Sequence, residues 1–255
     1  MTGLPPGIDP RRILDEVRWR RGQFLSLLEA LCHSESPSLD PGGQQAVHAV
    51  LAAHLDALGF AVRELPGPRS GGHLYARPRR RKRAAPVQLL LGHYDTVWPA
   101  GTLATMPFVI EGERVRGPGV YDMKGGLAQL VVALATLRGL DLEPAVTPVV
   151  LVNADEEVGS RESGHHVHRL ARLACRAFVL EPSLGMEGRL KTERKGVARY
   201  TVFVQGRAAH AGLDPAAGAS AILELSHVIQ ALFALNDPAR GITVNVGTID
   251  GGLRP

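Results

Sequence analysis

The sequence predicts an α/β protein with a central, mostly parallel sheet, followed by a smaller α+β unit. Continuous apolar runs at 86–95, 147–157 and 175–183 are typical of strands covered on both faces. Helical patterns alternate with these runs, which indicates a sheet with helices on both sides. After about residue 190 the order becomes strand, helix, strand without this rhythm. We therefore predict one domain over residues 1–190 and a second over 191–255.

The first domain is predicted element by element from its periodicity. We expect helices over residues 10–31, 44–58, 127–137 and 163–174, and strands over 60–67, 71–77, 86–95, 147–157 and 175–183. Apolar residues such as Ile13, Val17 and Phe24 recur at helical spacing in the first helix, and Gly59 follows the end of the second.

The second domain is shorter and has a different pattern. Residues 190–212 are predicted to form two antiparallel strands and a turn. A long helix follows over 216–235, and another strand over 241–252. No internal repeat is evident in the chain.

Composition excludes several classes of protein. The chain is 45% hydrophobic and 21% charged, as in soluble globular proteins. No apolar run reaches the roughly 18 residues that span a bilayer, and the first residues carry prolines and charges where a signal peptide needs an apolar stretch. Cys32 and Cys175 lack CxxC spacing and are expected to be buried thiols in a reducing compartment. We therefore expect a cytoplasmic protein that does not enter a membrane.

The net charge of +4 has a local source. Arg77 and residues 79–83 contribute six positive charges, more than the whole excess. The interpretation we favour is a solvated hairpin loop, while an acidic partner remains an alternative because a compact basic loop attracts phosphates. No aromatic residue is interleaved with the run, so a nucleic-acid partner is not expected.

Acidic and imidazole side chains follow the predicted buried strands. His93 and Asp95 end one run, Glu156 and Glu157 end the next, and Glu181 ends the third. Each has an ordinary explanation, such as a hydrogen-bonded pair or an acidic first turn of a helix. The carboxyl ends of parallel strands meet at one edge of a sheet, however, and so many like charges there would repel without cations. Imidazole and carboxylate are suitable ligands for such cations.

Four motifs in order, "GHYDTV", "GPGVYDMKGG", "NADEEVGS" and "LEPS", resemble the signatures of the M20 metallopeptidases, particularly the glutamate carboxypeptidase branch. The resemblance covers nearly the whole chain. It implies a zinc-peptidase-like catalytic domain and, after residue 190, a lid or dimerisation domain cut short at its C-terminal end. It also implies a homodimer that pairs through the lid.

The resemblance assigns roles to individual residues, with two divalent ions as cofactors. Zinc is the expected metal, and cobalt or manganese would also suit the ligands. His93 and Glu181 would be terminal ligands of one ion, Asp122 would bridge the ions, and Glu157 would bind the other. Glu156 would be the general base, and Asp95, also assigned to catalysis, would hold the His93 ring from behind. The peptide bond between Asp122 and Met123 would be cis.

The implied reaction is hydrolysis of an amide bond in a small peptide or N-acyl amino acid, releasing a C-terminal residue of the glutamate type. His210, in "HAG", would meet the charge that develops on the acyl oxygen. His165, His166 and His168 match no motif and are expected to lie on an exposed helix face.

The pattern departs from the family after "GTIDGG". The family continues into the rest of the lid, then into the final strands and another histidine ligand, which this sequence does not contain. We therefore expect an open edge strand over 243–249. The interpretation we favour is an incomplete copy of a two-zinc hydrolase, because Glu156 and the four available ligands are all intact. The alternative is a truncated, non-catalytic module for dimerisation or metal binding.

Overall fold

The computed structural model describes residues 9–81, 84–185 and 187–252. Contacts within the chain divide it into two units, Met1–Met186 and Glu187–Pro255. The sequence placed its boundary between residues 190 and 191. In the described part of the chain, no helix combines the length and the apolar character needed to cross a bilayer.

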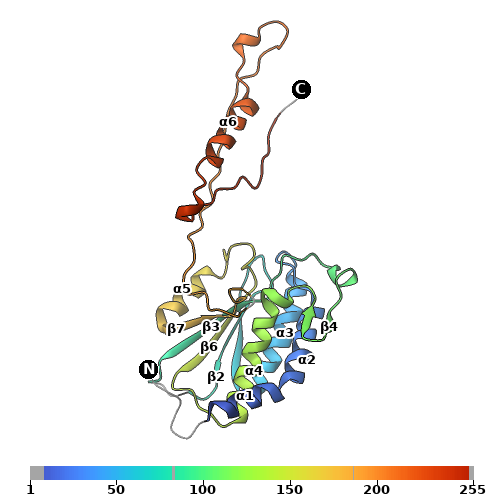
Figure 1. The fold of residues 1–255 in the computed structure, drawn as a ribbon, viewed down its shortest axis with the longest axis vertical. Helices are drawn as coiled ribbons and strands as arrows, with labels where there is room; N and C mark the ends of the chain where they lie inside the picture. The colour runs from blue at the N-terminus through green and yellow to red at the C-terminus, as the bar shows by residue number, and fades with distance from the viewer. Residues whose placement is uncertain (1–8, 82–83, 186, 253–255) are drawn as a thin grey trace. The chain divides into compact units, whose positions relative to one another are not determined.

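The first unit contains a five-stranded sheet in the order β1-β2-β6-β3-β7 (Figure 1). The strands are β1 (Phe60–Leu65), β2 (His73–Pro78), β3 (Val87–His93), β6 (Thr147–Asn153) and β7 (Ala174–Val179). β3 pairs in parallel with β6 and β7, whereas β2 pairs antiparallel with β1 and β6. Only β2 therefore runs against the other four strands, which confirms the predicted α/β class with a mostly parallel sheet.

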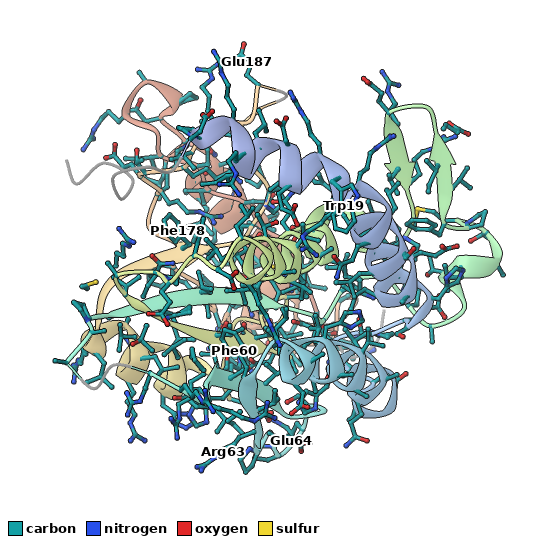
Figure 2. All side chains as sticks on the ribbon, turned by 90° about the horizontal axis from the view of Figure 1, so that it is seen from below. Trp19, Phe60, Arg63, Glu64, Phe178 and Glu187 are labelled. Carbon is teal, nitrogen blue, oxygen red and sulfur yellow. The ribbon has the colours of Figure 1, made fainter. Side chains whose placement is uncertain are left out.

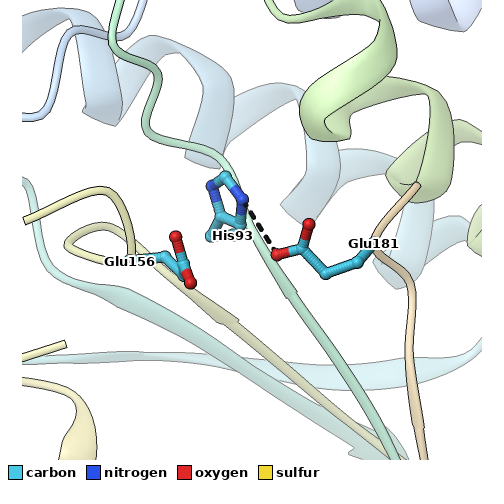
Figure 3. A group of neighbouring side chains, drawn as sticks. All are labelled: His93, Glu156 and Glu181. Carbon is cyan, nitrogen blue, oxygen red and sulfur yellow. Dashed lines mark ion pairs between the residues drawn. The ribbon is translucent and has the colours of Figure 1, made fainter. Parts of the chain in front are cut away.

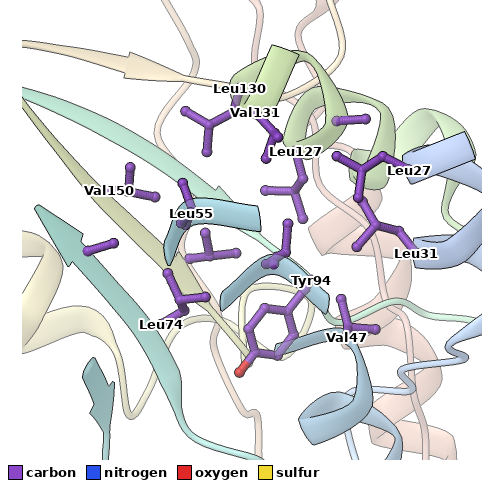
Figure 4. Close-up of a cluster of buried hydrophobic side chains, with 14 of the residues drawn as sticks. Leu27, Leu31, Val47, Leu55, Leu74, Tyr94, Leu127, Leu130, Val131 and Val150 are labelled. Carbon is purple, nitrogen blue, oxygen red and sulfur yellow. The ribbon is translucent and has the colours of Figure 1, made fainter. Parts of the chain in front are cut away.

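Helices cover both faces of this sheet (Figure 1). They are α1 (Pro10–Trp19), α2 (Arg21–His33), α3 (Pro41–Ala57), α4 (Gly125–Gly139) and α5 (Gly164–Leu173). Val150 points into the larger core with residues of α2, α3 and α4 (Figure 4), and Leu90 belongs to the same core. Leu89 and Leu151 pack instead with residues of α5. Alternate residues of β3 and β6 are thus buried on opposite faces, as their continuous apolar runs indicated. A small hairpin of β4 (Val109–Glu111) and β5 (Arg114–Arg116) completes the unit.

Two predicted helices differ from the structure, one by a break in its middle and the other in its first residue. The helix predicted over 10–31 is two helices, because Arg20 leaves the helical conformation (φ −80°, ψ 7°) between them. α1 has no buried residue, and its Trp19 is exposed (Figure 2). α3 begins before the predicted Gln44, because Asp40 caps its amides and Pro41 occupies its first turn.

The basic run does not lie in a hairpin loop. It connects β2 to β3, and β6 lies between these two strands in the sheet. Lys82 and Arg83 lie outside the described residues, while Arg79 pairs with Asp56. The hairpin prediction failed because adjacency in sequence does not fix strand order.

β7 is not the buried strand that its apolar sequence predicted. It pairs only with β3 among the described strands, and its residues are largely exposed, including Phe178 (Figure 2). Cys175 lies on this strand and is exposed, so the prediction that both cysteines are buried holds for Cys32 alone. The chemical character of a strand therefore does not ensure that a neighbour covers it.

The second unit contains α6 (Ala221–Phe233) and two short 3₁₀ turns, η3 (Pro215–Ala217) and η4 (Pro238–Arg240). Its described residues, 187–252, form no regular strand, only isolated bridges such as Arg207 with Ala219. The strands predicted over 190–212 and 241–252, and the open edge strand over 243–249, are therefore wrong. None of the described residues of this unit is buried, so these segments lack both a ladder of backbone partners and a covered face.

Candidate metal centre

His93 ends β3 and is only 1% exposed. Its Nε2 lies 3.1 Å from Oδ1 of Asp122 and 3.3 Å from Oε1 of Glu181, the latter drawn as a dashed line in Figure 3. On the other side of the ring, Nδ1 lies 3.0 Å from the backbone oxygen of Asp95 and 3.4 Å from its carboxylate. The imidazole is therefore held from behind by Asp95 and directs Nε2 toward two carboxylates.

Asp95 has a second task that the sequence did not indicate. Its two carboxylate oxygens accept hydrogen bonds from the backbone amides of Glu156 and Glu157, each at 3.1 Å, and Ser38 Oγ donates at 2.8 Å. The side chain is completely buried. Asp95 thus links the end of β3 to the acidic turn, which is the turn after β6 that carries Glu156 and Glu157.

Asp122 lies in the glycine-rich turn that precedes α4. Its peptide bond to Met123 is cis, which confirms the bond that the family resemblance implied. A Cβ on Gly126 would lie 2.0 Å from the backbone oxygen of Leu180, so only glycine allows this close approach. The turn therefore brings Asp122 up to the backbone that carries Glu181.

The electrostatics of this edge favour a cation. Burial raises the pKa of Asp122, Glu156 and Glu157, and the neighbouring carboxylates raise them further, against the opposing effect of His93. Burial disfavours a charged His93, but hydrogen bonds to Asp95 and Glu181 outweigh it and raise its pKa to about 11. The imidazolium is therefore the positive charge that balances this acidic cluster. A metal ion would displace that proton, because only the neutral ring binds metal.

Two groups of side chains bring ligand atoms within 4.8 Å of one another. One consists of His93, Glu156 and Glu181 (Figure 3), and the other of His93, Asp122 and Glu157. An imidazole with carboxylates suits zinc, cobalt or manganese, so the residues fit the implied metals. The grouping differs from the predicted one in that Glu156, the predicted base, lies among potential ligands. The individual roles of these residues remain predictions.

His210 belongs to the second unit. It is exposed, and its Nδ1 accepts a hydrogen bond of 3.1 Å from the backbone amide of Gly212. This contact stabilises the local turn, and the role in transition-state stabilisation remains a prediction.

Sequence reasoning missed several polar residues behind the site. Gln44 and His73, both completely buried, bind the backbone of Ala154, and half-buried Ser38 binds Asp95. The buried Lys124 donates to the backbone oxygen of Ser34 at 2.9 Å. A signal existed for Gln44: it takes the first place in the buried series of α3 that continues with Val47, Leu51 and Leu55. A polar residue at a core position of a helix is expected to make hydrogen bonds to other buried groups.

Comparison with known proteins agrees with this geometry. Residues 89–243, more than half of the chain, match the model of peptidase family M20/M25/M40. The chain is 32% identical to carboxypeptidase G2 of a Pseudomonas species over 87% of this chain and 53% of that protein. It is 40% identical to a succinyl-diaminopimelate desuccinylase of Gluconobacter oxydans over 49% of this chain and 32% of the other. The chain thus spans about half the length of carboxypeptidase G2, and less of the desuccinylase.

Solved structures show the same fold. A tripeptidase from Staphylococcus aureus matches with a TM-score of 0.62 and 19% identity, covering 97% of this chain and 62% of that one. A di-peptidase from Saccharomyces cerevisiae matches with a TM-score of 0.61 and 17% identity, covering 87% and 52%. Since the family model matches residues 89–243, a range that includes His93, Asp122 and Glu181, the chain belongs to peptidase family M20/M25/M40.

Proposed function

We propose that this chain carries the metal centre of a hydrolase that cleaves an amide bond in a small peptide or N-acyl amino acid. The observation that carries the proposal is the convergence of one imidazole and four carboxylates at a single sheet edge, in two groups of potential ligands. The relatives are a carboxypeptidase, a desuccinylase, a tripeptidase and a di-peptidase, which supports this substrate class. The resemblance of the motifs to the glutamate carboxypeptidase branch favours release of a C-terminal residue of the glutamate type, and similarity to a carboxypeptidase agrees with C-terminal cleavage.

The role that we propose for each residue follows from its surroundings. His93, Asp122, Glu157 and Glu181 would hold two divalent ions, zinc by preference. When bound, these ions would supply Lewis-acid activation of water and of the scissile carbonyl. Glu156 would take a proton from the attacking water and return it to the leaving amine. Its raised pKa suits it to this task, because a base works best when its pKa approaches the working pH.

Two parts of the proposal concern the second unit. We assign His210 to the developing charge on the acyl oxygen, and we expect a second copy of the chain to pair through this unit. The exposed apolar side chains of α6, among them Ile222 and Leu223, are a suitable surface for pairing. Light scattering during gel filtration measures the mass of the assembly, and a monomer at high concentration would contradict pairing.

The test is a titration of the purified, chelator-treated chain with Co²⁺, followed by visible absorption, together with hydrolysis assays. The substrates are N-acyl derivatives of glutamate, with the matching derivatives of leucine as controls. We expect two ions per chain and hydrolysis that chelation abolishes. Glu156→Gln should retain the ions and lose about 10²- to 10⁴-fold in kcat, since it removes the proton acceptor at nearly constant shape.

The outcomes separate the interpretations. A chain that binds no Co²⁺ would contradict the metal centre. Binding of two ions without hydrolysis would favour the non-catalytic, metal-binding module. Hydrolysis that Glu156→Gln leaves unchanged would contradict the assignment of the base.

A further inference from the structure

Ala154 connects the end of β6 to the acidic turn, and side chains from elsewhere bind both of its backbone polar groups. Its amide donates to Nδ1 of His73 at 3.2 Å, and its carbonyl accepts from Nε2 of Gln44 at 3.0 Å. Ala154, Gln44 and His73 are all completely buried. Water therefore cannot replace either bond at this point of the chain.

Gln44 connects three separate segments through one side-chain amide. Besides Ala154, its Nε2 donates to the backbone oxygen of Pro37 at 3.0 Å, and its Oε1 accepts from the backbone amide of Gly71 at 2.6 Å. A Cβ on Gly71 would lie 2.7 Å from the Cβ of Gln44, so the glycine permits this approach. Both hydrogens and the oxygen of the amide are used, which fixes its orientation.

The two residues after Asp155 are the predicted base, Glu156, and the predicted ligand, Glu157. Their amides are held by Asp95, which approaches from the end of β3. Gln44 approaches the same turn from α3 and binds it two residues earlier. The turn is thus held by three buried side chains from different elements: Asp95 binds the amides of Glu156 and Glu157, while Gln44 and His73 bind Ala154.

We propose that Gln44 is a positioning residue for the metal centre, acting through the carbonyl of Ala154 to set where Glu156 and Glu157 lie. The effect of Gln44 on catalysis rests on the proposed function. Its positioning of the turn does not, because these contacts are present in the metal-free chain. Ligands held within about 0.5 Å of their working geometry need this kind of support behind them.

The test compares Gln44→Met, which keeps the volume and loses the three hydrogen bonds, with the control Leu51→Ala. Leu51 is a completely buried residue of the same helix and does not bond the turn, so the control reports general loss of core packing. The first measurement is hydrogen exchange of residues 154–163 in the full, metal-free chain. The second is Co²⁺ affinity with the visible spectrum of the bound ion, both at a temperature where each variant is folded.

For Gln44→Met we expect exchange in residues 154–163 to rise at least tenfold over exchange in β3. We also expect Co²⁺ to bind about ten- to a hundredfold more weakly, with a changed spectrum. Leu51→Ala should raise exchange throughout the core without this preference. Equal effects of the two variants, or unchanged exchange in Gln44→Met, would overturn the proposal. If the parent chain binds no Co²⁺, the proposed function fails, and the exchange result still decides the role of Gln44.

Should Gln44→Met fail to fold, Gln44→Glu gives the same test. The carboxyl group retains an acceptor for Gly71 but carries at most one hydrogen, so it cannot donate to both Pro37 and Ala154. The same preferential rise in exchange is expected, and its absence would overturn the proposal.

Discussion

Gln44 in the first unit and Asn236 in the second both use a side-chain amide to hold backbone segments together. Gln44 bonds Pro37, Gly71 and Ala154, whereas Asn236 donates to the backbone oxygens of Phe233 and Val244 and accepts from the amide of Val244. Gln44 is completely buried and Asn236 is half-buried.

The surroundings decide what such contacts contribute. A buried donor or acceptor that loses its partner keeps the full desolvation penalty, whereas water can replace a partner at an accessible site. The buried residues of the described chain all lie in the first unit. Its polar contacts should therefore be costly to break, and those of the second unit inexpensive.

The largest effect is expected for Asp95→Ala. This change removes the acceptor of the Glu156 and Glu157 amides and the carboxylate beside the buried His93 ring, which keeps its contact with the Asp95 backbone oxygen. We expect a loss of about 3–5 kcal/mol in the free energy of unfolding, because one partner of a buried charged network is removed. Urea unfolding followed by circular dichroism measures it.

The matched change in the second unit is Asn236→Ala, for which we expect a loss of about 1 kcal/mol. If the two changes cost the same, burial would not be what distinguishes the polar contacts of the two units.

An apolar pair extends the comparison. Leu127 in α4 is completely buried, whereas Leu223 in α6 is 61% exposed. Leu127→Ala should cost about 2–5 kcal/mol in urea unfolding, because it removes buried methyl groups and leaves a cavity. At a protein concentration where the chain is monomeric, Leu223→Ala should change stability by less than about 0.5 kcal/mol. At concentrations where the chain pairs, the loss for Leu223→Ala should grow, and a loss that does not depend on concentration would contradict pairing through this face of α6.

The last prediction concerns the dependence of stability on pH. Burial lowers the pKa of His73, although Asp155 and Glu162 oppose the shift. The unfolded chain takes up a proton as pH falls through about 6.5, while the folded chain resists it. The stability that His73 contributes is therefore present above pH 6.5 and is lost as pH falls toward its folded pKa, by at most about 1.4 kcal/mol per pH unit.

His73→Asn is the matched variant, because its Oδ1 can still accept from Ala154 but does not titrate. Urea unfolding at pH 7.5 and 5.5 should show a smaller loss of stability for the variant than for the parent chain. An equal or larger loss would indicate that His73 is not the group that takes up the proton. His48, whose pKa burial also lowers, keeps part of the slope in both proteins.

The sequence correctly predicted the buried strands of the sheet wherever other parts of the chain cover both faces of the strand. β3 and β6 are such strands, and their apolar runs identified them. β7 and the segment around Phe203 have similar composition and no cover; Phe203 is 90% exposed. Periodicity reports which side chains can be buried, and the presence of a partner decides whether they are.

The site could be predicted because its motifs lie where strands end. His93, Glu156 and Glu181 came together at the carboxyl edge of the sheet as expected, with Asp122 beside them. Gln44 could not be assigned to Ala154, because the two residues are 110 positions apart and their contact depends on how α3 packs. The same limit applies to the bonds from Asp95 to the acidic turn.

The exposed strand β7 has a consequence for chemical modification. It presents the thiol of Cys175 to solvent, while Cys32 of α2 is buried in the larger core, and this burial raises its pKa to about 11. Thiolates are the reactive form, so a maleimide should attach at one position in the native chain and at two after denaturation. The protein thus has a single natural attachment point for a dye or a crosslinker, without engineering of its cysteines.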